Sequence, residues 1–126
     1  MSTVLEDLKR DYHSVYCNRL DWGCTIELLR LSGLFDRERL AVMEYNGCAE
    51  VSEMEARAVA RFMEINVLPS LRPRNRMMRD ASLPEVPHNG TGYREPSEQL
   101  KNSCASEEWL RRFIEFCKTC EGFRVW

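Results

Sequence analysis

The segment PSLRPRNRMMRDASLPEVPHNGTGYREP, residues 69–96, contains all five prolines of the chain. Proline fixes φ and has no backbone N–H, so a regular helix cannot run through this segment. The segment separates a proline-free block, residues 1–68, from a second proline-free block, residues 97–126. Because apolar residues recur at helical spacing in both blocks, the sequence predicts an all-α fold. We expect a single domain over residues 1–126, a small bundle of about five helices with a long irregular Pro- and Arg-bearing segment before the last helix.

Four of the expected helices lie in the N-terminal block. Thr3 and Glu6 form a capping-box pair for the first helix, which should run to about Leu20. The apolar stripe of this helix consists of Leu5, Leu8, Tyr12, Val15 and Tyr16. The later helices each show a capping residue at the start and a glycine or proline at the end, and they are expected over residues 25–33, 36–47 and 52–68. No segment shows the two-residue alternation of a convincing strand, so no sheet is expected.

The last expected helix begins at Ser103 or Ser106 and ends at Gly122. Its apolar content is too high for a solitary surface helix, so it should pack on the N-terminal block or on a partner. The tail that follows, residues 123–126, is unusually apolar for a chain end. We therefore expect the tail to dock onto the rest of the domain or onto a second copy.

Charge and hydropathy exclude some classes of protein. A formal net charge of −2 argues against a generally basic nucleic-acid binder and against a membrane-surface protein. No run approaches the roughly 18 apolar residues of a membrane span. The chain turns charged at Glu6 and Asp7, so it opens with no apolar signal region. We expect a cytoplasmic protein, in the host cytoplasm if it is phage-encoded, with its six cysteines reduced.

One cysteine motif deserves a chemical test. Cys117 and Cys120 form a C-x-x-C in the last turn of the last expected helix, where the helix dipole disfavours a thiolate. As half of a zinc site this pair would need His88 and Cys104 as further ligands, but zinc sites usually show two tightly spaced pairs. The sequence favours a core-packing role for both cysteines and predicts no bound metal and no cofactor.

A second constellation concerns the first expected helix. His13 and Cys17 would stand one turn apart there, with Cys24 further on, a spacing from which a nucleophile–base pair or a corner of a metal site can be built. No residue pattern indicates a group that orients the histidine, and a histidine beside an apolar stripe is commonplace. We therefore expect no enzymatic activity.

The arginine-rich run from Arg72 to Arg79 is the most plausible functional feature. Arginine makes forked contacts with carboxylates and phosphates, and methionine adds adaptable apolar contact. The sequence favours a non-enzymatic protein-binding module, of the inhibitor type that phages and mobile elements encode to block a larger host complex. The alternatives are a nucleic-acid binder that uses the arginines as phosphate clamps, or a solvated linker, and the chain is expected to be a monomer or a homodimer. The predicted partner-binding residues are Arg72, Arg74, Arg76, Met77, Met78, Arg79 and Trp126.

Overall fold

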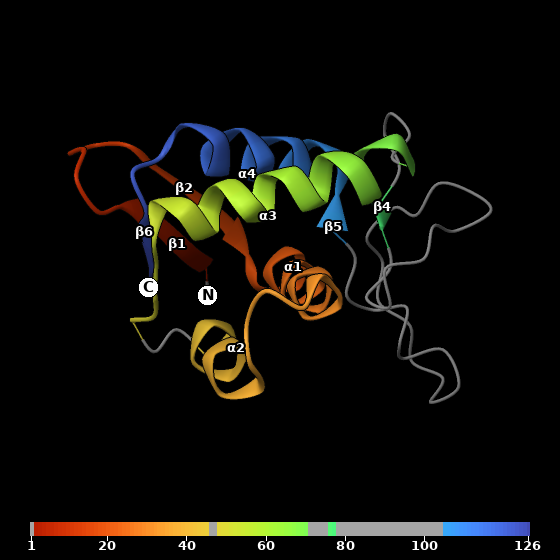
Figure 1. Cartoon of the computed structure of the whole chain (residues 1–126), viewed down its shortest axis with the longest axis horizontal. Helices are drawn as coiled ribbons and strands as arrows, with labels where there is room; N and C mark the ends of the chain where they lie inside the picture. Colours follow the sequence, from red (N-terminus) through yellow and green to blue (C-terminus); the bar gives the residue numbers. More distant parts are fainter. Residues whose placement is uncertain (1, 46–47, 71–75, 78–104) are drawn as a thin grey trace.

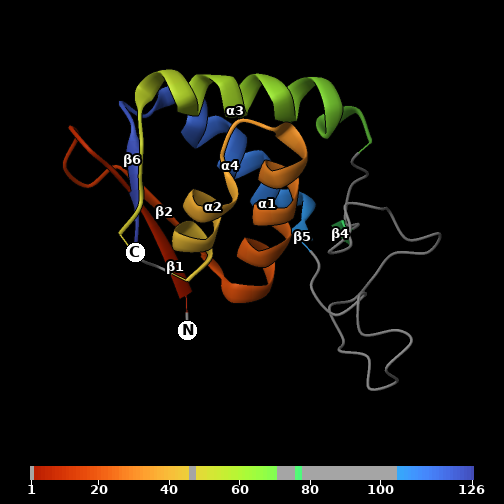
Figure 2. The same cartoon turned by 60° about the horizontal axis from the view of Figure 1, so that its bottom comes forward.

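The computed structural model describes residues 2–45, 48–70, 76–77 and 105–126 (Figure 1). Over these residues the chain is a mixed α/β protein, so the predicted all-α bundle is wrong. The α-helices are α1 (Arg19–Ser32), α2 (Arg37–Glu44), α3 (Glu53–Asn66) and α4 (Glu107–Thr119), with a 3-10 turn at Leu68–Ser70. Figures 1 and 2 show α3 and α4 running side by side, with α1 and α2 below that pair and a sheet at one end.

An antiparallel sheet joins the two ends of the chain. Its strand order is β2–β1–β6–β3, and every neighbouring pair is antiparallel. The strands are β1 (Ser2–Asp7), β2 (Ser14–Asn18), β3 (Glu50–Val51) and β6 (Phe123–Val125). Leu5 at the centre of β1 lies opposite both Val15 and Val125. A separate short ladder pairs β4 (Arg76–Met77) with β5 (Ala105–Ser106).

The first predicted helix is a β-hairpin in the structure. The residues that would have formed its apolar stripe include Leu8, Tyr12 and Tyr16, and all three are exposed. The residues buried in β1 follow a period of two instead, because Thr3, Leu5 and Asp7 face inward. Pairing with β6, more than a hundred positions away in sequence, secures this strand, and no local pattern signals such a partner.

The helix starts follow the predicted capping more closely. Ser52 and Glu55 form the complete capping box of α3, and the Asp36 side chain accepts from Arg39 N at the start of α2. The second predicted helix begins earlier than expected, because Asn18 is the N-cap of α1 and Thr25 lies inside it. The glycine end of that helix is confirmed, since Gly33 adopts φ 73°.

The core forms where α4 meets α1 and the sheet. Trp109 of α4 donates its indole N–H to Thr25 Oγ1 at 2.9 Å, and Trp22 of α1 donates to Met43 O at 2.9 Å. Phe113 contacts both Trp22 and Phe123 edge to face. The prediction that the C-terminal tail docks is confirmed, because it forms a central strand of the sheet with Phe123 and Val125 buried. None of the described helices is both long enough and apolar enough to span a bilayer.

Candidate binding surfaces

Most of the partner-binding residues predicted from the sequence lie where the structure gives no placement. Arg72, Arg74, Met78 and Arg79 lie outside the described residues. For Arg76 and Met77 the structure describes the backbone, which pairs with Ser106 and Ala105. The arginine-rich run is therefore still a prediction.

Trp126, the remaining predicted residue, is placed and is half-exposed (42%). Its backbone lies opposite Val4, with Trp126 N donating to Val4 O at 2.8 Å. Its indole N–H donates to Glu6 Oε2 at 2.9 Å, and the Arg124 guanidinium lies 5.4 Å from its ring centroid. Trp126 is thus held on the outer face of the sheet by partners from β1 and β6.

A second surface, missed by the sequence analysis, is the hairpin loop, residues 8–13, between β1 and β2. It projects from one end of the molecule beyond the sheet (Figure 1). Tyr12 in this loop adopts φ 65° and its side chain is fully exposed. A bulky residue in the left-handed region is strained, so the surrounding contacts must hold this conformation in place.

Those contacts converge on the buried carboxylate of Asp7, whose side chain is 0% exposed. Oδ1 accepts from Lys9 N at 3.0 Å and from Arg10 N at 3.2 Å, and Oδ2 accepts from His13 Nδ1 at 2.7 Å. Glu121 N, which follows α4, lies 3.3 Å from Oδ2. We call this set of hydrogen bonds the Asp7 clamp, because it fixes both ends of the hairpin loop and ties the loop to the C-terminal segment.

The electrostatics of the clamp favour an ionised carboxylate. Burial raises the pKa of Asp7, but hydrogen bonds from Lys9 N, from His13 and from further backbone amides outweigh burial and hold that pKa well below its usual range. The His13 ring also packs on Phe116 of α4, with ring centroids 5.0 Å apart. Arg10 reaches α4 too, where its guanidinium donates to Thr119 O.

The clamp resembles a catalytic triad only superficially. His13 Nε2 lies 3.5 Å from Thr119 Oγ1, while Nδ1 meets Asp7, as a base between an acid and a nucleophile would. The Thr119 hydroxyl, however, donates to Glu115 O at 3.0 Å, so its proton is directed at the helix backbone. The geometry therefore provides a structural link and no activated nucleophile.

The structure also corrects the predicted placement of His13 and Cys17 one turn apart on a helix. His13 lies in the hairpin loop and Cys17 in β2. Burial, and then the nearby Asp21 carboxylate, raise the pKa of Cys17 to about 12, which disfavours a nucleophilic thiolate.

The C-x-x-C cysteines are core residues. Cys117 and Cys120 are both buried, and burial is the main cause that raises the pKa of each thiol. Their proposed zinc partners, His88 and Cys104, lie outside the described residues. Among the residues that the structure describes, no group of three or more His, Cys, Asp or Glu side chains could hold a metal ion.

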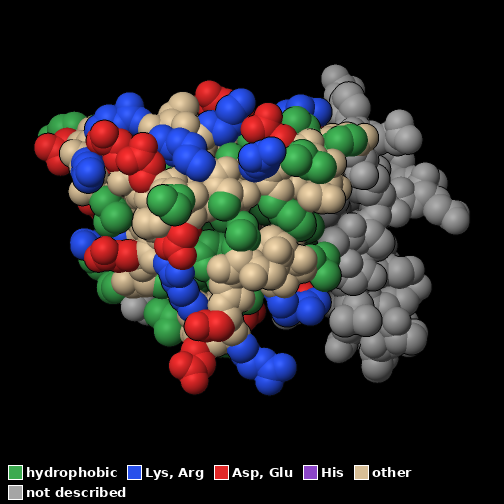
Figure 3. Space-filling model, viewed as in Figure 1, with side chains coloured by type: hydrophobic (Ala, Val, Ile, Leu, Met, Phe, Trp, Pro, Cys, Tyr) green, Lys and Arg blue, Asp and Glu red, His purple; other side chains and the backbone are tan. Residues whose placement is uncertain are grey.

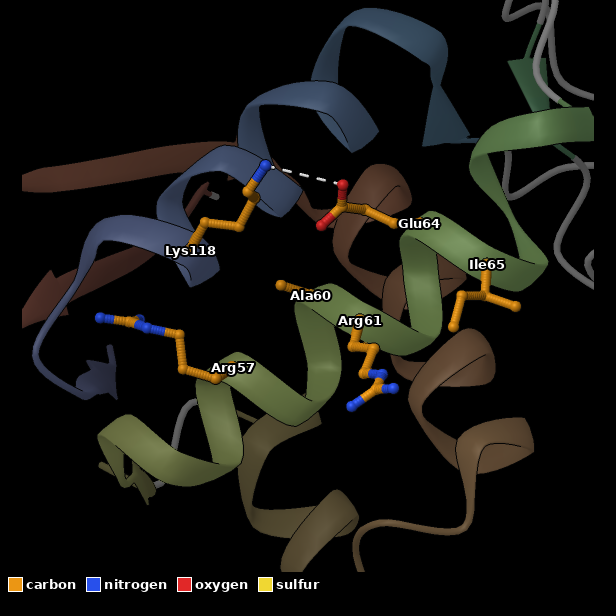
Figure 4. A pocket seen from close by; sticks show the side chains of 6 residues that line it. All are labelled: Arg57, Ala60, Arg61, Glu64, Ile65 and Lys118. Carbon is orange, nitrogen blue, oxygen red and sulfur yellow. Dashed lines mark ion pairs between the residues drawn. The ribbon is translucent and has the colours of Figure 1, made fainter.

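A third surface is an open pocket of about 440 Å³ between α3 and α4 (Figure 4). One face of α3 supplies five lining residues and α4 supplies Lys118. Lys118 Nζ lies 3.6 Å from Glu64 Oε2, and Arg57 donates to Cys117 O at 2.7 Å and to Glu53 Oε1 at 3.2 Å. The pocket therefore combines cationic side chains with an apolar wall. Its lining residues are Arg57, Ala60, Arg61, Glu64, Ile65 and Lys118.

Comparison with known proteins adds no relative, since no protein-family model, no curated protein and no solved structure matches this chain significantly.

Proposed function

We propose that this chain is a non-enzymatic protein-binding module that acts by occupying the surface of a partner protein. The observation that carries the proposal is the fully exposed Tyr12, presented at φ 65° by a loop that a buried carboxylate fixes. Large rigid aromatic residues dominate the energy of protein interfaces, and tyrosine is among the residues enriched at hot spots. A loop that is already ordered loses little entropy on binding, which favours affinity.

The neighbours of Tyr12 suit the rim of such an interface. Lys9, Arg10 and Asp11, which precede Tyr12 in the hairpin loop, are exposed and carry charges of both signs. Charged residues at the rim of an interface raise the specificity and the rate of association more than they raise the affinity. We further propose that the partner is a larger complex which this small chain inhibits. That finer proposal rests on the absence of recognisable catalytic motifs in the sequence.

The alternative of a nucleic-acid binder has less support. Its arginines, Arg72, Arg74, Arg76 and Arg79, have no described side chains. In Figure 3, Lys and Arg side chains are interspersed with Asp and Glu over α3, so this face offers no continuous basic track. Binding to a phosphate backbone normally requires such a track.

The test is affinity purification from the native host with three forms of the chain. Wild type, Tyr12→Ala and the control Tyr45→Ala are compared, because Tyr45 is also strongly exposed (70%) but lies at the end of α2. We expect the same protein partner with wild type and Tyr45→Ala, and recovery lower by at least about tenfold with Tyr12→Ala, because truncation of a hot spot typically costs 2 kcal/mol or more.

Two further outcomes of this test are informative. Equal recovery with Tyr12→Ala would remove Tyr12 from the interface and with it the basis of the proposal. Recovery that nuclease treatment abolishes, and that falls steeply as salt is raised, would support the nucleic-acid alternative instead.

A further inference from the structure

The two edges of the sheet are built very differently. The β3 edge has two residues, and the backbone oxygen of Glu50 accepts from Arg39 Nη2 at 2.7 Å. The Glu50 side chain forms an ion pair with Arg124 at 2.9 Å, and Ser52, the next residue after the strand, caps α3. Short length and charge are devices that protect an edge strand from pairing with another chain. The β3 edge is therefore protected.

The β2 edge lacks these devices. Its five residues, SVYCN, include no charge and no proline. Val15 and Cys17 lie opposite Leu5 and Thr3 in the ladder with β1. An uncharged strand of this length, with a β-branched and an aromatic residue, is the kind of edge that accepts another strand.

The ladder shows which backbone groups of β2 face outward. Asp7 N donates to His13 O at 2.9 Å. The odd-numbered residues of β2, Val15 and Cys17, therefore form their backbone hydrogen bonds with β1. In an antiparallel strand the backbone groups of successive residues point to opposite sides. The N–H and C=O groups of Ser14 and Tyr16 therefore point away from the sheet. Within the described part of the chain, neither residue has a hydrogen bond on that side.

We propose that β2 is a dimerisation edge whose occupant is β2 of a second copy of this chain. The two strands pair antiparallel about a two-fold axis at Tyr16, which extends the sheet continuously across both copies. In this register each Tyr16 N–H donates to the Tyr16 carbonyl of the other copy, and Ser14 lies opposite Asn18. The inference is independent of the proposed binding function of the hairpin loop.

The composition of β2 favours a second copy as the occupant. A two-fold axis places the same strand on both sides, and an uncharged strand meets no like-charge repulsion when it pairs with itself. Tyr16, which is 65% exposed on the outer face, would face its symmetry mate as a cross-strand aromatic pair. The outward-facing N–H and C=O groups of Tyr16 find each other across the two-fold axis, because the axis places the same residue on both strands.

The first test uses sedimentation equilibrium of wild type, Tyr16→Pro and Tyr16→Thr over a range of concentrations. Proline removes the N–H that only the other copy uses, whereas threonine keeps that donor and a β-branched side chain. We expect a dimer for wild type and for Tyr16→Thr. For Tyr16→Pro we expect a dissociation constant raised by at least about tenfold, because two intermolecular hydrogen bonds are lost per dimer. A monomeric wild type, or a dimer that Tyr16→Pro leaves unchanged, would overturn the proposal.

A second measurement covers the case in which Tyr16→Pro does not fold. Residue-resolved amide exchange of wild type is followed by NMR at low and at high protein concentration. We expect the Tyr16 amide to become protected as concentration rises, while the Val15 and Cys17 amides are protected at both concentrations by the ladder with β1. Tyr16 exchange that does not change with protein concentration would overturn the proposal.

Discussion

The hairpin loop and the α3–α4 pocket both carry charged side chains at the surface, but their polar groups are arranged in opposite ways. In the loop, donors from two segments converge on Asp7, which is wholly buried. In the pocket, the Lys118–Glu64 pair and the Arg57–Glu53 pair both remain substantially exposed. Exposed pairs gain little because water competes with them and side-chain entropy is lost, whereas buried hydrogen-bonded charges are costly to disrupt.

This difference separates a surface of fixed shape from an adaptable one. Loss of the Asp7 carboxylate would leave several part-buried N–H groups without an acceptor, so the loop conformation and the fold depend on it. The pocket side chains can rearrange around a ligand at little cost. We therefore expect shape recognition at the hairpin loop and mainly electrostatic attraction at the pocket, and the following changes test that contrast.

The largest effect is expected for Asp7→Ala. This change removes the acceptor of several amides and leaves the buried site unsatisfied, so the free energy of unfolding should fall by on the order of 3 kcal/mol. Chemical denaturation measures it, with Asp7→Asn as a control that keeps the shape and one acceptor. A loss below about 1 kcal/mol for Asp7→Ala would mean that the clamp does not hold the loop.

The same carboxylate predicts how stability depends on pH. The folded-state pKa of Asp7 lies below its ordinary value near 4, so the folded state binds that proton less readily than the unfolded chain does. The contribution of the ionised Asp7 carboxylate to the free energy of unfolding is fully present above about pH 5 and is lost as the pH falls below about 4. Glu55, whose pKa the hydrogen bond from Arg39 lowers to about 2, contributes in the same direction.

Denaturation across this pH range distinguishes the two carboxylates. Asp7→Asn should reduce the loss of stability at acid pH more than Glu55→Gln does, because the Asp7 side chain is buried whereas that of Glu55 is 32% exposed. An acid profile of Asp7→Asn that matches wild type would show that Asp7 is not ionised in the way its hydrogen bonds require.

A smaller effect, of opposite sign, is expected for Tyr12→Gly. Glycine adopts φ 65° without steric strain, so the free energy of unfolding should rise by about 0.5–1 kcal/mol even though the ring is lost. Partner recovery should nevertheless fall as it does for Tyr12→Ala. Thermal melting measures the change in the free energy of unfolding. A Tyr12→Gly variant that is less stable than wild type would show that the tyrosine ring contributes to the stability of the fold.

The smallest effect is expected in the pocket. Lys118→Ala and Glu64→Ala, alone or together, should each change the free energy of unfolding by less than about 0.5 kcal/mol. A double-mutant cycle measures the coupling of the pair. A coupling above about 1 kcal/mol that survives high salt would show that this pocket is as rigid as the hairpin loop.

The helices of the fold were largely predictable and the sheet was not. The capping residues Asp36 and Ser52 act within one helical turn, so the chain around them carries the whole signal. The hairpin was misread because Thr3 and Glu6 imitate a capping box. The strand that overrides this local signal, Phe123–Val125, comes from the other end of the chain. The period of two in β1 is formed by buried Thr3 and Asp7 as well as Leu5, so the apolar residues of the sequence do not show it.

The candidate binding surfaces were predictable only in part. Trp126 was identified from its place in an apolar tail and is half-exposed. Tyr12 was assigned to the interior stripe of a helix, which hid its exposure. A signal for the loop was present, since Asp7 precedes the polar run Lys9–Asp11 and aspartate commonly accepts from backbone amides two and three residues on. The burial of Asp7 and its bond to Glu121 depend on the docking of distant segments.

The central claim is that the Asp7 carboxylate holds the hairpin loop in the conformation that presents Tyr12. Amide hydrogen exchange, resolved by residue with NMR at neutral pH, tests it directly, because Lys9 N and Arg10 N donate to Asp7 whereas Asp11 N and Tyr12 N donate to no acceptor within the described residues. The account predicts protection of the first two amides at least about tenfold above that of the other two, and loss of this difference in Asp7→Ala. Equal, unprotected exchange at all four amides in wild type would contradict the account.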